Sequence, residues 1–507
     1  MSIVDSNKAA SSLPEGTIAI FFIQIFSTLS YSVLYSTLVL YMTGKLGFSA
    51  KSANSITGIF VAINFALHLL GGYCGGRFLS NRSLFCVGMF AQIAGCILLT
   101  AQSEAYLYYG LAAFLTGSGL NVTCINCMLT QRFKAKDHRR EAAFLWNYAG
   151  MNIGFFIGFT LSGFFQLSQN YQRLFLLSSL GNLVALFICL FFWHCLADQN
   201  TAYARMEKTR QWRVSLGGLG LILCLPLILV PLLHFADWAN KLILVVGCLM
   251  FATTCWFAFQ QKSRDAREKI IAFAVLMIVS TVFWTLYQIG PMGLTSFINH
   301  NVERHWSMMI IPPQWFQNIN TLSIVLGGPL MSLVLSRMRL GGIKVNIPSQ
   351  FALALLLIGL AFALLPVGIA SANSAGLISP GWIVLSFILQ SVGELLISPI
   401  GYAMVGALVP NSLQGVMMGM WMLVAGVGAT LSSYSSTWMT AGQDSVSPLA
   451  TNSGYSSVFL SLGLFAMVAS FILFMLIPTL RAWIEDKPAE LVSETDVEKS
   501  IIIGTSP

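Results

Sequence analysis

Long apolar runs fill most of the chain, and short polar stretches separate them. Each run reaches the length of about 20 residues that lets a helix cross the hydrocarbon core of a bilayer. The pattern predicts fourteen spans, at residues 17–43, 53–79, 83–101, 105–131, 142–166, 174–196, 214–234, 240–260, 270–298, 313–336, 349–371, 380–408, 413–440 and 455–480. The predicted fold class is therefore an all-α membrane protein.

Pro and Gly interrupt several of these spans at positions where soluble helices avoid them. Pro291, Pro329, Pro366 and Pro399 lie within apolar runs, and several glycines stand between residues 150 and 163. Membrane helices tolerate such residues where neighbouring helices or a cavity satisfy the backbone. Two interpretations stay open: these residues mark moving or cavity-lining helices, or they let helices approach each other closely.

The composition agrees with a membrane protein. Of the 507 residues, 56% are hydrophobic and 9% are charged, and the mean hydropathy is +0.75. Soluble domains carry about 25% charged residues. The first residues lack the basic region and cleavage site of a signal peptide, so we expect the first span to be kept. The ten cysteines are interpreted as packing residues, and we expect neither disulfides nor a metal or cofactor.

The basic residues predict how the chain is oriented. With the N-terminus in the cytoplasm, 22 of the 27 Lys and Arg residues fall on the cytoplasmic side and 5 on the other, as the positive-inside rule expects. The even number of spans then places both termini in the cytoplasm. The net charge of +8 thus reflects topology, and we expect no nucleic-acid partner. The predicted location is the bacterial inner (plasma) membrane, spanned many times.

A basic stretch after the sixth span divides the chain into two halves, as in carriers built from two bundles. The predicted parts are a cytoplasmic N-terminal segment (1–16), a six-helix bundle (17–196), a basic cytoplasmic linker (197–213), an inserted helical hairpin (214–260), a second six-helix bundle (261–480) and an acidic cytoplasmic tail (481–507). The hairpin is almost wholly apolar, so we expect it at the periphery rather than in a cavity wall.

One acid stands out from this pattern. Glu394, within QSVGELLISPIGYAMVGALVP (390–410), is the single carboxylate placed deep inside an apolar span. An ionisable group in hydrocarbon costs a few kcal/mol unless it faces a cavity or a partner, which makes it a candidate functional residue. The alternative is a buried, neutral acid held by a hydrogen bond between helices.

Three segments resemble motifs of the proton-dependent oligopeptide transporters, a family of the major facilitator superfamily: GELLISPIGYAMVGALVP (393–410), NYAGMNIGFFIGFTLSGF (147–164) and LQGVMMGMWML (413–423). FWTLYQIGPMGL (283–294) and FQNIN (316–320) are similar to helices that line the second half of that family's cavity. The resemblance implies two six-helix bundles plus an inserted two-helix hairpin, and it implies a functional monomer that carries small peptides together with protons.

The first span departs from that family's ExxERFxYY motif. Gln24 and Ser27 stand where the family has acids, Thr28 stands at the Arg position, and Val122 falls where the fourth span usually has a lysine. Gly76 replaces the acid of a gating motif after the second span. The usual charges of the first half are therefore absent, which leaves amine-bearing or neutral amide-like solutes open as substrates beside di- and tripeptides.

Polar and aromatic residues recur at helical spacing within the spans, as the lining of a cavity would. The predicted substrate-cavity residues are Gln24, Tyr31, Tyr35, Tyr148, Asn152, Trp284, Gln288, Gln317, Asn320, Ser398 and Trp421. Two alternatives stay open, because Ser27 and Thr28 can bond to their own helix and Trp residues often serve packing. His68 is a candidate second proton site, although a lone buried His is more often structural.

Burial favours the neutral form of a carboxylic acid, which suits a group that takes up and releases a proton. We therefore expect Glu394 to bind either a proton or the amino group of a substrate. The predicted function is proton-coupled uptake by alternating access. The rivals are a facilitator or carrier of another metabolite with altered or no coupling, and a receptor or scaffold derived from a carrier. An enzyme is not expected, because the spans hold no HExxH or GxSxG motif and no Cys/His grouping.

Overall fold

The structure is a computed structural model that describes residues 13–134, 137, 139–342, 346–410, 413–440 and 447–485, without the side chains of residues 339, 402 and 403. Most of the predicted N-terminal segment and nearly all of the acidic tail therefore lie outside the described residues. Fourteen helical segments are long and apolar enough to cross a membrane. The prediction of an all-α membrane protein with fourteen spans is confirmed.

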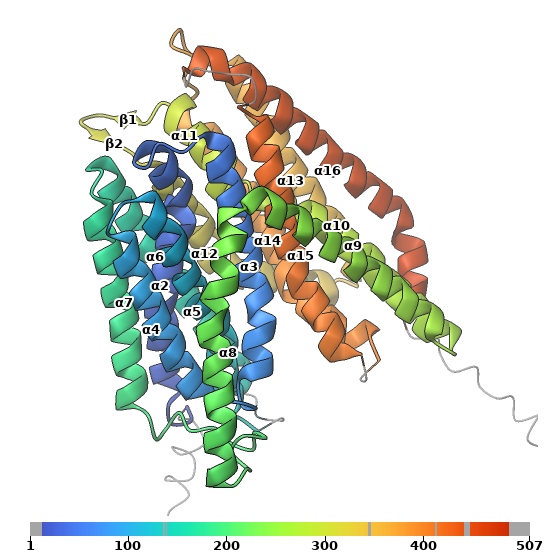
Figure 1. The fold of residues 1–507 in the computed structure, drawn as a ribbon. Helices are drawn as coiled ribbons and strands as arrows, with labels where there is room; N and C mark the ends of the chain where they lie inside the picture. Colours follow the sequence, from blue (N-terminus) through green and yellow to red (C-terminus); the bar gives the residue numbers. More distant parts are fainter. Residues whose placement is uncertain are drawn as a thin grey trace, which may run out of the picture.

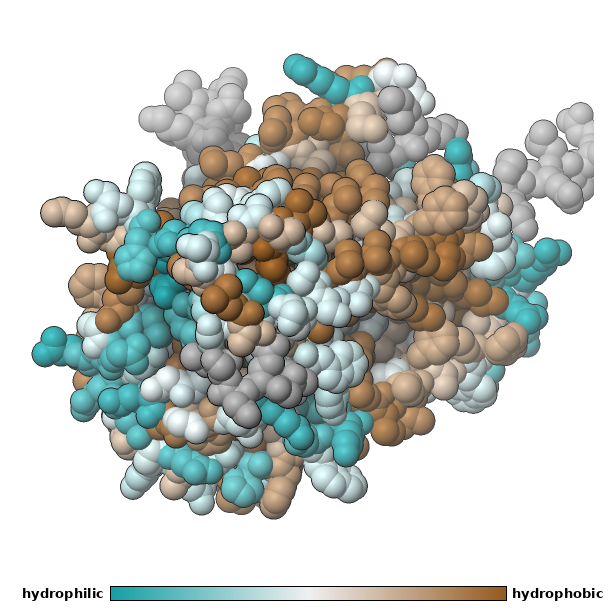
Figure 2. All heavy atoms as spheres, turned by 90° about the horizontal axis from the view of Figure 1, so that it is seen from above, coloured by the Kyte–Doolittle hydropathy of each residue, from teal (hydrophilic) through white to brown (hydrophobic). Residues whose placement is uncertain are grey.

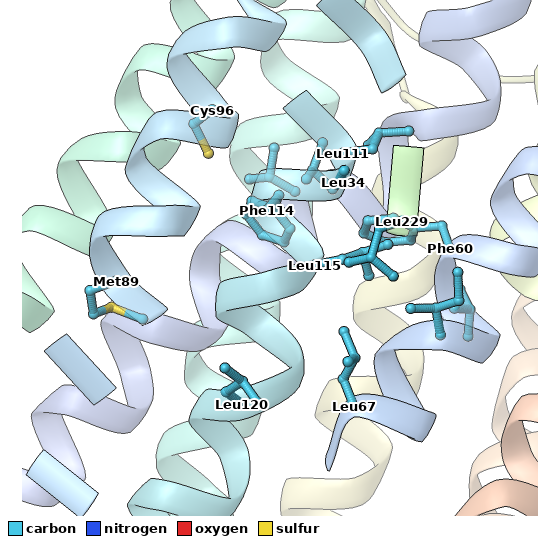
Figure 3. Packing of buried hydrophobic residues seen from close by; sticks show 14 of the residues in the cluster. Leu34, Phe60, Leu67, Met89, Cys96, Leu111, Phe114, Leu115, Leu120 and Leu229 are labelled. Atoms are coloured by element: carbon cyan, nitrogen blue, oxygen red, sulfur yellow. The ribbon is translucent and has the colours of Figure 1, made fainter. Parts of the chain in front are cut away.

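The helices before the linker form the first half of the molecule. They are α2 (Thr17–Gly44), α3 (Ala50–Cys74), α4 (Asn81–Leu99), α5 (Glu104–Thr130), α6 (Arg139–Leu167) and α7 (Tyr171–Phe191). Apolar side chains from all of them pack into one core, in which Phe60, Phe114 and Leu115 are fully buried. Figure 3 shows part of this core, with Met89 and Cys96 of α4 facing α5.

The first helix after the linker, α8 (Lys208–His234), packs into the core of the first half. The following helices form the second half around a separate core. They are α9 (Ala236–Gln260), α10 (Arg264–Tyr287), η1 (Gly290–Leu294), α11 (Thr295–Asn301), α12 (Pro313–Leu340), α13 (Ile347–Ala370), α14 (Pro380–Leu408), α15 (Gln414–Trp438) and α16 (Pro448–Ile484). A small hairpin of β1 (His305–Trp306) and β2 (Met309–Ile310) precedes α12.

One of the four predicted proline breaks interrupts a helix. The segment Gly290–Leu294, which follows α10, is a π-helical turn with a kink at Met292 (φ −113°, ψ −107°), next to Pro291. Helices α12, α13 and α14 continue through Pro329, Pro366 and Pro399. A proline in the interior of a helix removes one backbone donor and can kink the helix. Of these four prolines, only Pro291 lies where the helix changes its hydrogen-bond pattern.

The two halves lean apart toward one end of the molecule. In Figure 1, α9 and α16 diverge from α8 toward the bottom of the view, where the linker after α7 also lies, whereas β1 and β2 lie at the top. We call the bottom the linker side and the top the strand side. Figure 2 views the strand side, where brown apolar surface extends over much of the molecule and teal hydrophilic residues are most frequent at the left and lower left, with others at the right edge.

Candidate functional site

Glu394 lies within α14, and its carboxylate is bound by groups from neighbouring helices. Oε2 accepts a hydrogen bond from Nδ2 of Asn320 at 3.0 Å, and the same amide nitrogen donates to Oγ of Ser391 at 3.0 Å. Oδ1 of Asn320 accepts a hydrogen bond from the Tyr287 hydroxyl at 3.3 Å. Helices α10, α12 and α14 thus hold one acid in a network of neutral donors.

The environment of Glu394 is polar but uncharged in its immediate contacts. Among the described residues, no ion pair includes Glu394, although the side chain is only partly exposed. A carboxylate buried without a cation relies on hydrogen bonds, and it is neutralised by a proton at lower cost than a surface carboxylate. The arrangement suits a group that alternates between a charged and a neutral state.

A hydrogen bond crosses from the first half of the molecule to the second at this level. The Tyr35 hydroxyl of α2 donates to Oε1 of Gln288 at 2.8 Å, directly after the end of α10. Tyr35 also lies close enough to Glu394 and Tyr287 to interact with them electrostatically. The network around Glu394 therefore extends to a helix of the other half.

Aromatic rings pack beside the ring of Tyr35 on the first-half side. The ring of Tyr35 lies 5.8 Å from that of Tyr31, 6.4 Å from that of Phe155 and 6.4 Å from that of Phe159. On the second-half side, the Trp284 ring meets that of Tyr287 edge-on at 5.2 Å. The site therefore combines one acid with amides, phenolic hydroxyls and aromatic faces.

The predicted polar face of α2 is divided between two environments. Tyr31 and Tyr35 are partly exposed, but Gln24 is buried at the contact with α6, where its Oε1 accepts from Nδ2 of Asn147 at 3.2 Å. Nε2 of Gln24 donates to Oγ1 of Thr28 at 2.8 Å. Tyr35 thus lies near Glu394 and Tyr31 packs beside Tyr35. Gln24 instead joins α2 to α6, and its predicted role in the cavity stays a prediction.

The other predicted residues occupy different places. Tyr148 is exposed and interacts electrostatically with Tyr287, and the amide of Asn152 donates to the backbone oxygen of Tyr148 at 2.9 Å. Nε2 of Gln317 donates to Oγ1 of Thr295 at 3.0 Å within the second half. Ser398 lies one turn beyond Glu394 on α14 and is partly exposed.

Trp421 and His68 are both enclosed by packing. Trp421 is buried, and a Cβ at Gly401 would lie 1.9 Å from its ring, so the indole fills the space that this glycine leaves. His68 is buried on α3, with its ring edge-on to Phe65 at 5.6 Å and no hydrogen-bond partner for Nε2 among the described residues. Their predicted roles in substrate and proton binding are not decided by this packing.

Three residues of the network were not predicted from the sequence. Tyr287 and Ser391 complete the surroundings of Asn320, and Asn147 binds Gln24. Tyr287 follows Trp284 by three positions and Ser391 precedes Glu394 by three, so each shares a helix face with a residue that was predicted. Helical spacing could therefore have found Tyr287 and Ser391, but not Asn147, which stands one position before the predicted Tyr148.

We expect the substitution Tyr35→Phe to loosen the contact between the two halves. It removes the donor to Gln288 and keeps the ring, and a hydrogen bond of this kind contributes about 1 kcal/mol, or roughly a fivefold change in population. Hydrogen–deuterium exchange of peptides covering Gly290–Leu294 should rise. Tyr31→Phe is the matched control, because the Tyr31 hydroxyl makes no hydrogen bond to another described residue; equal exchange in both variants would contradict the prediction.

The sequence is similar to a known protein family and to known proteins along most of its length. The sequence profile of PTR2, described as the POT family, matches residues 81–477. The chain is 30% identical over 481 residues to dipeptide and tripeptide permease A of Chromobacterium violaceum, covering 94% of this chain and 96% of the relative. It is 27% identical over 489 residues to the protein of the same name in Escherichia coli K12, covering 96% of each.

Solved structures share the fold. A crystal structure of peptide transporter POT in complex with sulfate superposes with a TM-score of 0.80 at 23% identity, covering 95% of this chain and 99% of that one. A POT family transporter in complex with 5-aminolevulinic acid gives a TM-score of 0.79 at 22% identity, covering 92% and 97%. At these identities the likeness shows that the architecture is common to these proteins.

Proposed function

Because the chain belongs to the POT family of membrane transporters and is therefore not an enzyme, we propose that it takes up small peptides or related solutes together with protons. The fold is that of the major facilitator superfamily, as the sequence predicted. The observation that supports the proposal best is the single acid, Glu394, held by Asn320 within reach of groups from both halves.

The proposed substrates are di- and tripeptides or other small solutes that carry an amine or an amide. The support is the name of the relatives, dipeptide and tripeptide permease, together with the chemistry of the site. Amide and phenol groups of Asn320, Gln288 and Tyr35 can donate and accept hydrogen bonds as a peptide backbone requires. The aromatic rings beside them can pack against apolar side chains of a substrate.

Glu394 is the proposed site of the coupling proton. Symport requires that proton and substrate be bound in the same state, so Glu394 is neutral while the substrate is held by the surrounding hydroxyls and amides. When the proton and the substrate have left on the opposite side, the ionised carboxylate is stabilised by the Asn320 amide. In the alternative role, the ionised carboxylate pairs with the substrate amine while the coupling proton is carried by another group. His68, buried without a partner for Nε2 among the described residues, is the proposed second proton site.

The linker side is the proposed cytoplasmic side. Basic residues on the connections and helix ends there, including Arg77, Arg82 and Arg132, support this orientation through the positive-inside rule. The protein is then a multi-pass protein of the bacterial inner membrane, closed toward the outside by contacts on the strand side. A monomer is the proposed functional unit, since each chain carries both halves of the site.

A second candidate is a facilitator without proton coupling. Gln24 forms neutral hydrogen bonds with Asn147 and Thr28, where charged residues would otherwise handle protons. Without those charges, coupling depends on Glu394 and on the proposed second site, His68. The two candidates differ in whether a pH gradient drives the substrate above its equilibrium concentration.

Uptake into proteoliposomes tests the proposal directly. We expect purified protein to accumulate alanylalanine when the outside is more acidic than the inside, and to stop at equilibrium when both sides have the same pH. Accumulation that ignores the gradient would favour the facilitator. Binding of alanylalanine with no transport would favour a receptor, and no response to any member of a panel of peptides and amines would contradict the proposal.

A further inference from the structure

The two inserted helices do not pack together along their length. Helix α8 follows the first half: Ile222, Leu225 and Leu229 are buried in its core, and Oγ of Ser215 donates to the backbone oxygen of Phe78 at 3.4 Å. Figure 3 shows Leu229 among the side chains of that core, near Leu115 and Phe60. Helix α8 is therefore fixed to the first half.

Helix α9 follows the second half in the same way. Near the strand side, Oδ1 of Asn240 accepts from Oγ1 of Thr430 on α15 at 3.2 Å. One and two heptads further along α9, a Cβ at Gly247 would lie 2.8 Å from Val427, and Oγ1 of Thr254 lies 3.3 Å from Sδ of Met420. Helix α9 thus contacts α15 from Thr430 to Met420.

A single residue, Phe235, connects the end of α8 with the start of α9 on the strand side. Consecutive Cα atoms are about 3.8 Å apart, so these two helix ends cannot move far from each other. In Figure 1 the helices meet at the top and diverge downward. The covalent link therefore ties the first half to the second at the strand side, beside the contact between α3 and α15.

The first turn of α9 also binds α3, which belongs to the other half. Nδ2 of Asn240 donates to the backbone oxygen of Ser55 at 2.9 Å and lies 3.0 Å from its Oγ, while the Ser55 hydroxyl donates to Oδ1 of Asp237 at 2.5 Å. Asn240 is 1% exposed, and its amide oxygen is bound to Thr430 at the same time. One buried side chain thus bridges α3 and α15.

Alternating access requires the strand side to open during transport, which separates α3 from α15. We propose that Ser55, Asp237 and Asn240 form a clasp that holds the strand side closed and must release when it opens, with α9 travelling with α15. This inference rests on the proposed transport function. It assigns the inserted hairpin a role in the cycle, as a hinge between the halves at Phe235, with Asn240 as a positioning residue.

We expect the contact at Ser55 to release because α9 contacts α3 over a shorter length than it contacts α15. Helix α9 holds α15 through three separated points, Thr430, Val427 and Met420, but its hydrogen bonds to α3 are confined to Ser55.

Apolar packing against the first half is limited to the start of α9, where Ala236 and Ala239 are buried in the first core. Further along α9, Met250 and Ala258 are buried in the second core, and α9 also packs against α10. Leaving α3 therefore costs a few hydrogen bonds and the packing of these early residues, whereas leaving the second half would expose apolar surface along the rest of the helix. The shorter contact is therefore the one expected to open.

Two reversible cross-links test this assignment. The double variant Ser55→Cys with Asn240→Cys allows α9 to be linked to α3. The double variant Asn240→Cys with Thr430→Cys allows α9 to be linked to α15. A reducible bis-methanethiosulfonate linker suits both pairs, because the side chains of each pair are in hydrogen-bond contact. Locking one side blocks alternating access, so linking the first pair should lower uptake of alanylalanine about tenfold or more and reduction should restore it. Linking the second pair should leave uptake nearly unchanged.

Either of two results would overturn the proposal. Unchanged uptake with α9 tied to α3 would mean that the clasp stays closed, and an equal block with α9 tied to α15 would mean that α9 does not travel with α15. The unmodified chain treated with the same linker is the control, because Cys224 and Cys248 are exposed on α8 and α9.

A second measurement tests the clasp independently of the transport function. Asn240→Ala should raise hydrogen–deuterium exchange of residues 50–58 at the start of α3, even where no substrate is transported. Thr253→Val is the matched variant on α9, since among the described residues its hydroxyl binds only the backbone of Leu249 and the residue is partly exposed. Equal exchange in both variants would refute the clasp, whereas failure of the unmodified protein to transport any peptide would refute the proposed function alone.

Discussion

Replacing Glu394 with glutamine is expected to abolish accumulation driven by a pH gradient. Glutamine keeps the size of the side chain and can still accept a hydrogen bond from Asn320, but it cannot take up or release a proton. Initial uptake of alanylalanine under an acidic-outside gradient should fall by about two orders of magnitude, the scale of losses when a proton-transfer group is removed. Proteoliposome uptake with and without the gradient measures the effect.

Exchange of substrate at equal pH separates the two roles of Glu394. If the acid carries only the proton, the variant should still exchange labelled for unlabelled alanylalanine; if it also pairs with the amine, exchange should weaken as well. Glu104→Gln is the matched control, because Glu104 lies in the first turn of α5 at the strand side and is exposed. An unchanged response of Glu394→Gln to the gradient would show that the coupling proton is bound elsewhere.

Gly158→Val is expected to destabilise the first half of the molecule strongly. A Cβ at this position would lie 1.7 Å from Oγ of Ser32 and 2.8 Å from the backbone oxygen of Leu29, so α2 and α6 would have to separate. Overpacking of this kind costs about 3 kcal/mol. Thermal unfolding followed by size-exclusion chromatography in detergent should show a clearly lower midpoint.

Gly220→Val controls for the intrinsic effect of valine in a helix. Gly220 lies on α8, and a Cβ there would meet no atom within 4 Å, so both variants share the change in helix propensity and differ in the clash. A similar loss of stability in both would mean that backbone freedom, rather than the close approach of α2 and α6, makes the glycine necessary.

The glycines between residues 150 and 163 illustrate how an open interpretation is resolved by packing. Gly150, Gly154 and Gly158 face α2, with Phe21, Ile25 and Ser32 close to the places where Cβ atoms would stand. These positions serve close helix approach, one of the two interpretations that the sequence allowed. Gly163, in contrast, lies against Trp315 of the other half, where the Trp315 indole donates to the backbone oxygen of Thr160 at 3.1 Å.

The inserted helices illustrate what apolar periodicity leaves undecided. Their length and apolar character predicted two spans, and the structure has both. The sequence suggested a hairpin at the periphery, but it held no signal that α8 would pack with the first half and α9 with the second. Lipid-facing and protein-facing leucines are equally apolar, so composition does not distinguish the partner of a membrane helix.

The sequence by itself determined the membrane class, the number of spans and the isolation of Glu394, because each depends on the chemistry of residues close together along the chain. Only the tertiary structure decided which polar groups meet. Asn320 reaches Glu394, Tyr35 reaches Gln288, and Gln24 turns to Asn147 instead of the tyrosines on its own helix face. Each pair joins different helices, and hydrogen bonds between helices depend on how the helices pack and rotate against each other.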